Sequence, residues 1–229
     1  MVGKKPHSGN GQKQKKVFVV DDHPIVRRGL VELIGQEEDL VVCGQAEDAH
    51  QAMKGIKTLK PDIVIVDISL KDRSGIELIK DIKAQYAGLA VLTLSMHDES
   101  LYAERALRAG AKGYIMKQEA TERVITAIRK VLSGQVYVSN GMAAKIVSKF
   151  AGSAPTAGAT VTDRLSDREL EVFCLIGRGY GTRQIAEKLH LSVKTIETYR
   201  AHIKEKLSFA SADELLRHAI QWVSSQDKG

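Results

Sequence analysis

Residues 17–22 read Val-Phe-Val-Val-Asp-Asp, four apolar residues followed by two carboxylates, and this stretch decides the fold. A second apolar run, at residues 63–66, also ends in a carboxylate, Asp67. Short apolar runs that alternate with helical patterns predict strands of a parallel sheet buried on both faces. Because such sheets bind ligands just beyond the carboxyl ends of their strands, we expect Asp21, Asp22 and Asp67 to meet at one edge.

Three carboxylates at one edge are a candidate cation site. Like charges held this close repel each other unless a positive charge lies among them. Hard oxygen ligands suit Mg²⁺, which keeps part of its water shell and pairs with phosphate oxygens. A single Asp at a strand end is usually a solvated loop residue, so the prediction depends on the combination of all three.

The alternation of strand and helix continues to about residue 134. Further apolar runs predict strands at 40–43, 89–94 and 113–116. Apolar residues at helical spacing predict helices at 24–34, 49–59, 76–82, 102–109 and 124–132. The pattern predicts an α/β fold, a five-stranded parallel sheet with helices on both faces.

Two more polar residues follow strands of this sheet, Ser95 after the fourth and Lys117 after the fifth. A carboxylate can attack a phosphoryl group as a nucleophile, and a metal ion can neutralise the charge of that group. An ammonium and a hydroxyl can hold the remaining phosphoryl oxygens. A lone Lys or Ser in a loop is usually solvated. The pattern is specific because every member lies at the carboxyl end of a strand.

Residues 17–134 resemble the receiver domain of bacterial two-component response regulators, which has a flavodoxin-like fold. The matching pieces are Asp21-Asp22-His23-Pro24, Asp67 after Ile-Val-Ile-Val, Thr93-Leu94-Ser95 and Gly113-Tyr114-Ile115-Met116-Lys117. The resemblance implies that Asp67 is the phosphoacceptor and that Ser95 and Lys117 contact the phosphoryl group. Tyr114 would be the switch aromatic.

The resemblance also implies a Mg²⁺ site made by Asp22, Asp67 and the backbone carbonyl of Ser69, with Asp21 acting largely through water. The sequence departs from many receivers at two places. Gln118 stands where a Pro often follows the lysine, and residues 69–73 lack the Pro that often follows the phosphoacceptor. Both departures concern loop geometry, and hence phosphate lifetime, rather than a reactive group.

The composition changes after residue 138. Residues 139–162 are predicted to be a linker, with a helix at 142–150 followed by an uncharged segment rich in Ala, Gly, Ser and Thr. Residues 163–229 then begin with Ser166 and Glu169, a capping box before an apolar run. A short helix at 182–189, a tight turn and a longer helix at 193–207 fit a helix-turn-helix, although the pattern alone fits a plain helical hairpin as well.

Residues 165–222 resemble the LuxR-type DNA-binding domain. The matching pieces are Leu165-Ser166-x-Arg168-Glu169-x-Glu171-Val172, Gln184-Ile185-Ala186, Leu191-Ser192-x-x-Thr195-Ile196 and Lys206-Leu207. With the receiver, this resemblance suggests the NarL/FixJ subgroup of response regulators and a second helix in the DNA major groove.

The longer helix carries the predicted DNA contacts. The resemblance places the base-reading positions at Glu197, Thr198 and Ala201. Lys194, Thr195 and Lys204 suit phosphates, and Arg200 is a further cation on or near this face. The closing helix, Ala212–Val223, carries the residues for which the resemblance implies a dimer contact: Leu215, Leu216, Ala219 and Trp222. Part of the same face must also pack on its own domain.

Composition narrows the class of protein. The chain has 229 residues and a formal charge of +6, but residues 163–229 hold 11 basic and 10 acidic side chains. Residues 1–16 hold five Lys and no acid, and are predicted to be a disordered tail. The two Cys lack metal-ligand spacing. No apolar run approaches the ~20 residues that span a bilayer, and no signal peptide is visible, so we expect a cytoplasmic protein without membrane contact.

These features predict a transcriptional regulator with a tail (1–16), a receiver (17–138), a linker (139–162) and a DNA-binding domain (163–229). The expected partners are a sensor histidine kinase, double-stranded promoter DNA, a second copy of the chain on phosphorylation, and RNA polymerase. One alternative is a phosphatase-like enzyme with an aspartyl-phosphate intermediate. Ser69 stands where such an enzyme has its general acid, and residues 165–222 would be unexplained. The other alternative is a DNA-binding regulator that is independent of phosphate, against which the intact acidic pocket argues.

Overall fold

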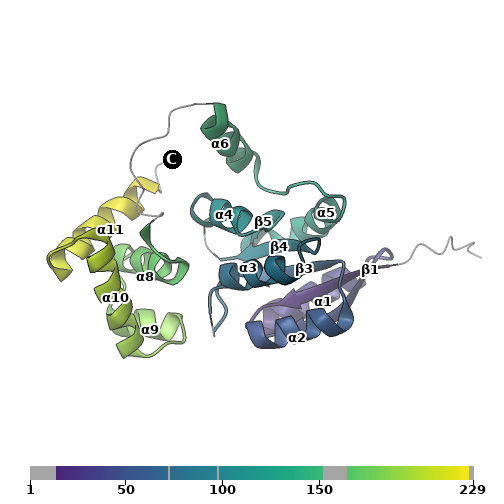
Figure 1. Ribbon diagram of the computed structural model, residues 1–229, viewed down its shortest axis with the longest axis horizontal. Coiled ribbons are helices and arrows are strands. Elements are labelled where there is room, and N and C mark those ends of the chain that lie inside the picture. Colours follow the sequence, from purple (N-terminus) through teal and green to yellow (C-terminus); the bar gives the residue numbers. More distant parts are fainter. Residues whose placement is uncertain (1–13, 72, 97, 152–163, 227–229) are drawn as a thin grey trace, which may run out of the picture.

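The computed structural model describes residues 14–71, 73–96, 98–151 and 164–226 (Figure 1). A parallel sheet forms the centre of the first domain, with strand order β2-β1-β3-β4-β5. The strands are β1 (Lys15–Val20), β2 (Leu40–Ala46), β3 (Ile63–Asp67), β4 (Ala90–Ser95) and β5 (Gly113–Met116). The helices between and after them are α1 (Pro24–Gly35), α2 (Ala49–Leu59), α3 (Gly75–Gln85), α4 (Glu99–Arg108) and α5 (Ala120–Leu132). The predicted α/β fold with five parallel strands is confirmed.

The two faces of the sheet have separate cores. Phe18 and Val20 of β1 pack with α2, α3 and α4, whereas Val17 and Val19 pack with α1 and α5 on the other face. These four side chains are at most 1% exposed. A strand covered on both sides by helices needs apolar residues at successive positions, which explains the unbroken apolar run. The predicted tail contributes its last two residues to β1, which begins at Lys15.

The strand order reverses between β1 and β3, which lie side by side in register from Val17↔Ile63 to Val20↔Val66. β4 pairs with β3 on its other side, so that Asp67 lies opposite Leu94. The point of reversal is where open α/β sheets leave a crevice for a ligand. Gly75, which begins α3, sits directly behind this edge. A Cβ there would lie 1.9 Å from the carbonyl oxygen of Asp67, so no residue with a side chain fits.

The remaining helices are α6 (Asn140–Ala151), α8 (Asp167–Gly177), α9 (Thr182–Lys188), α10 (Val193–Leu207) and α11 (Ala212–Gln226). The predicted capping box is present, with Ser166 and Glu169 bonding each other's backbone N–H groups at the start of α8. The uncharged part of the predicted linker lies almost wholly outside the described residues. None of the described helices is both long enough and apolar enough to cross a membrane.

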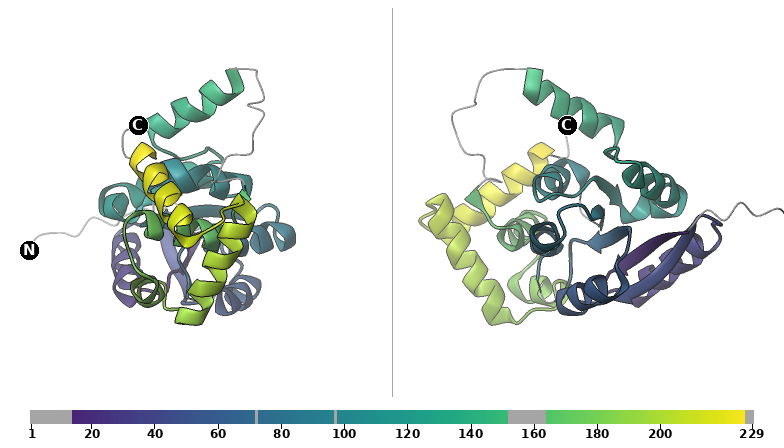
Figure 2. Two further views of the ribbon diagram at one scale, coloured as in Figure 1. Left: turned by 90° about the vertical axis from the view of Figure 1, so that its left-hand side faces the viewer. Right: turned by 45° about the vertical axis from the view of Figure 1, so that its right-hand side comes forward.

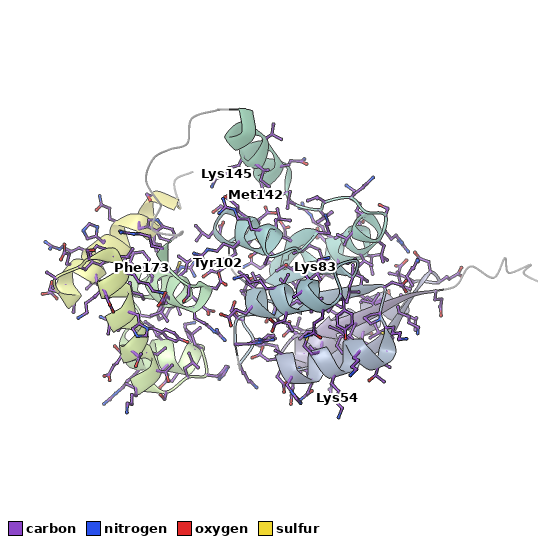
Figure 3. The ribbon with its side chains drawn as sticks, in the orientation of Figure 1. Lys54, Lys83, Tyr102, Met142, Lys145 and Phe173 are labelled. Atoms are coloured by element: carbon purple, nitrogen blue, oxygen red, sulfur yellow. The ribbon has the colours of Figure 1, made fainter. Side chains whose placement is uncertain are left out.

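α8 is buried on all sides, with every residue from Glu169 to Ile176 at most 9% exposed. One side packs on α10 and α11, where Phe173 meets Trp222 with ring centroids 5.7 Å apart. The other side faces the first domain, where Tyr102 of α4 is 1% exposed (Figure 3). Figures 1 and 2 show α8 between the sheet domain and α10. The two domains therefore share one buried apolar cluster.

Side chains of both domains bond across this interface. Arg105 of α4 donates to the Asp167 carboxylate at 2.5 Å and to the Leu165 carbonyl at 2.8 Å. Ser69, two residues after β3, donates from its hydroxyl to Oε1 of Glu171 at 3.1 Å. Arg168 donates to Oε2 of Glu171 at 2.7 Å and also to the Leu70 carbonyl. The loop after β3 is thus bonded directly to α8.

Candidate functional site

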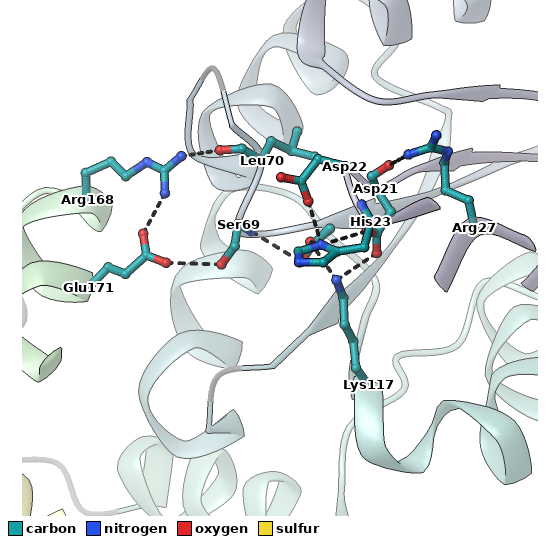
Figure 4. Close-up of polar contacts among 10 residues, drawn as sticks. Asp21, Asp22, His23, Arg27, Ser69, Leu70, Lys117, Arg168 and Glu171 are labelled. Carbon is teal, nitrogen blue, oxygen red and sulfur yellow. Dashed lines mark hydrogen bonds and ion pairs between the residues drawn. The ribbon is translucent and has the colours of Figure 1, made fainter. Parts of the chain in front are cut away.

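The structure brings the three predicted carboxylates together at the carboxyl ends of β1 and β3 (Figure 4). Asp21, Asp22 and Asp67 are 1%, 4% and 1% exposed. One potential ligand atom from each of them and one from His23 lie within 4.8 Å of one another. We call the set formed by the three carboxylates with Ser95 and Lys117 the strand-end pocket.

Lys117 supplies the positive charge of this pocket. Its Nζ lies 2.8 Å from Oδ2 of Asp21 and 2.7 Å from Oδ2 of Asp67, and its side chain is 6% exposed. Burial opposes the charge of Lys117, but Asp67 and Asp21 outweigh that effect and raise its pKa. The position of Lys117 follows from the short β5, because the chain leaves the sheet there for one 3₁₀ turn at Lys117–Glu119.

The surroundings of Asp67 contain both groups that raise its pKa and groups that lower it. Burial raises its pKa to about 6, the Lys117 charge opposes this rise, and the neighbouring Asp21 charge adds to it. The N–H of Ser69 donates to Oδ1 of Asp67 at 3.2 Å. A protonated carboxyl is a poor nucleophile, so further positive charge in the pocket would favour the reactive, ionised form.

The pocket also fits a divalent cation. Oδ1 of Asp22 and Oδ2 of Asp21 are buried, and within the described part of the chain neither has an aligned hydrogen-bond donor, although His23 Nδ1 lies 2.6 Å from the first and Lys117 Nζ 2.8 Å from the second. Buried carboxylate oxygens without a hydrogen bond are costly unless a charge compensates them. The acidic cluster of Asp21, Asp22 and Asp67 could therefore hold Mg²⁺, and such an ion would neutralise an incoming phosphoryl group.

Ser95 of the pocket ends β4, and Tyr114 lies beside it in β5. They are 0% and 1% exposed, and their side chains are hydrogen-bonded to each other. Burial is the main cause of the raised pKa of Tyr114. The ring of Tyr114 is already buried in this structure, and its role as the switch aromatic stays a prediction.

Some residues of the site were not singled out from the sequence. The Nδ1 atom of His23 lies 2.6 Å from Oδ1 of Asp22, and the only sequence signal was its position directly after the two carboxylates. Arg27 donates to the backbone carbonyl of Asp21 at 2.5 Å. Glu171 reaches Ser69 from 102 residues away, and no local pattern reports such a contact.

The predicted DNA-contact residues share the outer side of α10. Ile196, Ile203 and Leu207 face inward and are buried. Lys194, Glu197, Thr198 and Ala201 are exposed, whereas Thr195, Arg200 and Lys204 are half-buried. We call these seven residues the recognition surface. Figures 1 and 2 show α10 on the side of α8 away from the sheet domain, so docking of the domains leaves this surface uncovered.

Comparison with known proteins assigns each of the two domains to a family. Residues 17–129 match the family "Response regulator receiver domain", and residues 163–219 match "Bacterial regulatory proteins, luxR family". The oxygen regulatory protein NreC of Staphylococcus aureus is 36% identical over 210 residues, covering 90% of this chain and 97% of NreC. The chain belongs to the NarL/FixJ-type response regulators.

Solved structures similar to this response regulator include RcsB of Salmonella typhimurium, with a TM-score of 0.60 and 26% identity over 91% of this chain and 98% of that one. Two RcsB dimers bound to two parallel DNAs match with a TM-score of 0.55 and 27% identity, over 90% and 97% of the chains. The family is one of transcriptional regulators and not a typical enzyme family, which favours the regulator over the phosphatase-like alternative.

The predicted dimer contacts of the response regulator divide into two groups. Leu215 and Ala219 are 0% exposed and pack inside their own domain, where a Cβ on Gly177 would lie 2.4 Å from the Ala219 carbonyl oxygen. Trp222 is half-buried against Phe173. Leu216 is 39% exposed, so it is the member of the set that offers an outward apolar surface. A dimer role for this helix stays a prediction.

Proposed function

We propose that the regulator is switched by phosphorylation of Asp67 from a sensor histidine kinase, and that phosphorylation promotes dimerisation and promoter binding in the cytoplasm. The observation that carries the proposal is the environment of Asp67. Its carboxylate is 1% exposed, accepts from Lys117 at 2.7 Å and lies beside two further buried carboxylates. A structural ion pair would need one acidic partner for the lysine, not three acids at a strand edge.

The residues of the strand-end pocket suit each part of the transfer. An oxygen of Asp67 attacks the phosphorus, so that an O–P bond forms as the bond from phosphorus to the donor atom breaks. Lys117 and Ser95 hold phosphoryl oxygens by charge and hydrogen bond. Asp22, Asp67 and the Ser69 carbonyl would hold Mg²⁺, with Asp21 through water, and the ion would supply charge neutralisation.

The loop after β3 offers a route from this pocket to the DNA-binding domain. Ser69 lies two residues from Asp67 and bonds Glu171 of α8, while Arg168 bonds the carbonyl of Leu70. Phosphorylation changes the charge at one end of this short path. We expect it to loosen the docking of α8, so that two DNA-binding domains can pair on a promoter and work with RNA polymerase.

The first test is chemical. The protein is incubated with Mg²⁺ and a small acyl phosphate donor, and the modified residue is mapped by mass spectrometry. We expect one phosphoryl group on Asp67, no labelling of Asp67→Asn, and normal labelling of Asp48→Asn, since Asp48 only caps α2. Unchanged labelling of Asp67→Asn would overturn the assignment.

The second test links labelling to DNA. Affinity for promoter DNA found by genome-wide mapping is measured with and without the donor. Because the second domain carries almost no net charge, a dimer that doubles the phosphate contacts is expected to bind far more tightly than one copy. Equal affinity with and without phosphate would favour the regulator that is independent of phosphorylation.

A further inference from the structure

His23 is held at the edge of the acidic cluster by its neighbours in the chain. It directly follows Asp21 and Asp22, and Pro24 begins α1 immediately after it. The backbone N–H of His23 donates to Oδ1 of Asp21 at 2.8 Å. The proline ring restricts the conformation of the residue before it, so the imidazole starts from a defined backbone position.

The imidazole reaches into the cluster from the solvent side. Its Nδ1 lies 2.6 Å from Oδ1 of Asp22, 3.3 Å from Oδ1 of Asp21 and 3.9 Å from Oδ2 of Asp67. The side chain of His23 is 52% exposed while those of the three carboxylates are at most 3% exposed. Figure 4 shows the ring among the side chains of Asp21, Asp22 and Lys117. One nitrogen therefore points inward while the rest of the ring meets solvent.

Of the three carboxylates, Asp22 lies nearest to the imidazole of His23. Lys117 already pairs with Oδ2 of Asp21 and Oδ2 of Asp67. Oδ1 of Asp22 is buried, has no aligned hydrogen-bond donor in the described part of the chain, and faces the His23 nitrogen. Neighbouring ligand atoms on an ion with bonds of about 2.1 Å lie roughly 3 Å apart. The distances from His23 Nδ1 to the nearest oxygens of Asp22 and Asp21 are 2.6 and 3.3 Å, on either side of that value. A modest rotation of these side chains therefore admits an ion.

The donor type points to a class of ion. Mg²⁺ takes oxygen ligands, as the three carboxylates and the Ser69 carbonyl provide. An imidazole nitrogen beside carboxylate oxygens instead suits divalent ions of the first transition series. We propose that the strand-end pocket binds a first-row transition-metal dication such as Mn²⁺ with His23 Nδ1 as a direct ligand beside Asp22 and Asp67. His23 thereby makes the pocket prefer such an ion over Mg²⁺.

A competing role for His23 makes the opposite prediction. If the imidazole only neutralises Asp22 when no ion is bound, it competes with every divalent ion, and its removal strengthens the binding of Mn²⁺ and Mg²⁺ alike. If the imidazole is a ligand, its removal weakens the binding of Mn²⁺ and leaves Mg²⁺ almost unchanged. The sign of the change for Mn²⁺ decides between the two roles.

The experiment uses the full-length protein without a phosphate donor. Mn²⁺ binding is titrated by the loss of the free-ion electron paramagnetic resonance signal, and pulsed spectra of bound Mn²⁺ report coupling to ligand ¹⁴N. In the unaltered protein we expect binding that Mg²⁺ displaces and that Asp22→Asn abolishes, together with a ¹⁴N coupling. His23→Gln is expected to lose the coupling and about tenfold or more in Mn²⁺ affinity, since loss of even an outer-sphere partner typically costs that much.

His202→Gln is the matched control. Its side chain is also 52% exposed and its Nδ1 also lies near a carboxylate, 3.8 Å from Glu169, but outside the pocket. We expect this variant to keep both the affinity and the ¹⁴N coupling. Bound Mn²⁺ without a ¹⁴N coupling, or tighter Mn²⁺ binding by His23→Gln, would overturn the inference.

The inference rests on the metal site of the proposed phosphorylation pocket, but the two fail in different ways. Failure of the ligand role leaves labelling of Asp67 intact in the presence of Mg²⁺. Failure of the phosphorylation proposal leaves the Mn²⁺ spectrum of the unmodified protein as predicted.

Discussion

The strand-end pocket and the recognition surface are both expected to meet phosphate groups, yet they are built in opposite ways. In the pocket, Asp67 and Lys117 are buried and 2.7 Å apart, so each side chain depends on the other. On α10, Lys194 and Glu197 stand exposed, and the buried side of the helix holds their backbone in place. The chemistry expected in the pocket can therefore be predicted from its residue types. The residue types of the recognition surface predict contact with DNA more clearly than they predict which DNA sequence is bound.

The largest effect is expected from removing the pocket's own cation. Lys117→Met keeps most of the side-chain volume but leaves Asp21 and Asp67 without their positive partner. Loss of one preorganised charge that holds the transferring group typically costs ~10²–10³ in rate. The rate of Asp67 labelling by a small phosphodonor measures this, with Lys112→Met as the control outside the pocket. A change of less than about tenfold would mean that the lysine is structural.

The second effect is on stability. Burial raises the pKa of Asp67 from 3.8 to about 6, so the folded protein binds a proton more readily than the unfolded chain. Between those values the folded state gains stability as the pH falls, and above about pH 6 the ionised carboxylate costs it. Asp67→Asn should therefore stabilise the protein at pH 7.5 by roughly 1–3 kcal/mol when divalent ions are chelated.

Denaturant unfolding at several pH values measures this effect. The stability of the unaltered protein should approach that of Asp67→Asn as the pH falls from 7 toward 4. A constant difference between the two proteins across this range would contradict the raised pKa of Asp67.

The recognition surface should respond differently at two neighbouring positions. Glu197 is a predicted base-reading residue, and Glu197→Ala should change discrimination between operator sequences by about 1–3 kcal/mol. Lys194→Ala should instead weaken binding to all sequences and reduce the salt slope by about 0.9. Binding titrations against single-base operator variants at two salt concentrations separate these effects. If both variants lost the same affinity for every operator sequence, Glu197 would not be a base-reading residue.

The smallest effect concerns the contact between the loop after β3 and α8, which lies between the pocket and the recognition surface. Glu171→Gln keeps the shape of the side chain that bonds Ser69 and Arg168 but removes its charge. Hydrogen bonds that involve a charged group contribute about 1.5–3 kcal/mol, and the amide keeps part of this. We expect the unphosphorylated protein to bind DNA a few-fold more tightly, with faster amide exchange in the loop after β3. The matched control is Glu187→Gln on the exposed side of α9. If Glu171→Gln left the DNA affinity unchanged, the docking of α8 would not regulate DNA binding.

Much of the molecule could be predicted because its patterns are local. The apolar runs before Asp22 and Asp67 predict buried strands, and the carboxyl ends of parallel strands meet wherever such strands are neighbours. The helix predicted at 193–207 is present as α10, and its apolar residues Ile196, Ile203 and Leu207 are buried. Boundaries were less accurate: β2 continues to Ala46, and α4 begins at Glu99 because Asp98 caps it.

What only the tertiary structure decided involves contacts between elements far apart in the chain. The spacing of Leu215 and Ala219 defines an apolar face but not what covers it, and α8 does so within the same domain. The bond between Ser69 and Glu171 and the burial of Tyr114 against Ser95 likewise depend on how two finished elements pack. Hydrophobic periodicity determines which side of an element is buried, whereas the partner of that side is set by shape and charge across an interface. The sequence alone therefore predicted which residues form the pocket, and the fold decided how the loop after β3, next to that pocket, is bonded to α8.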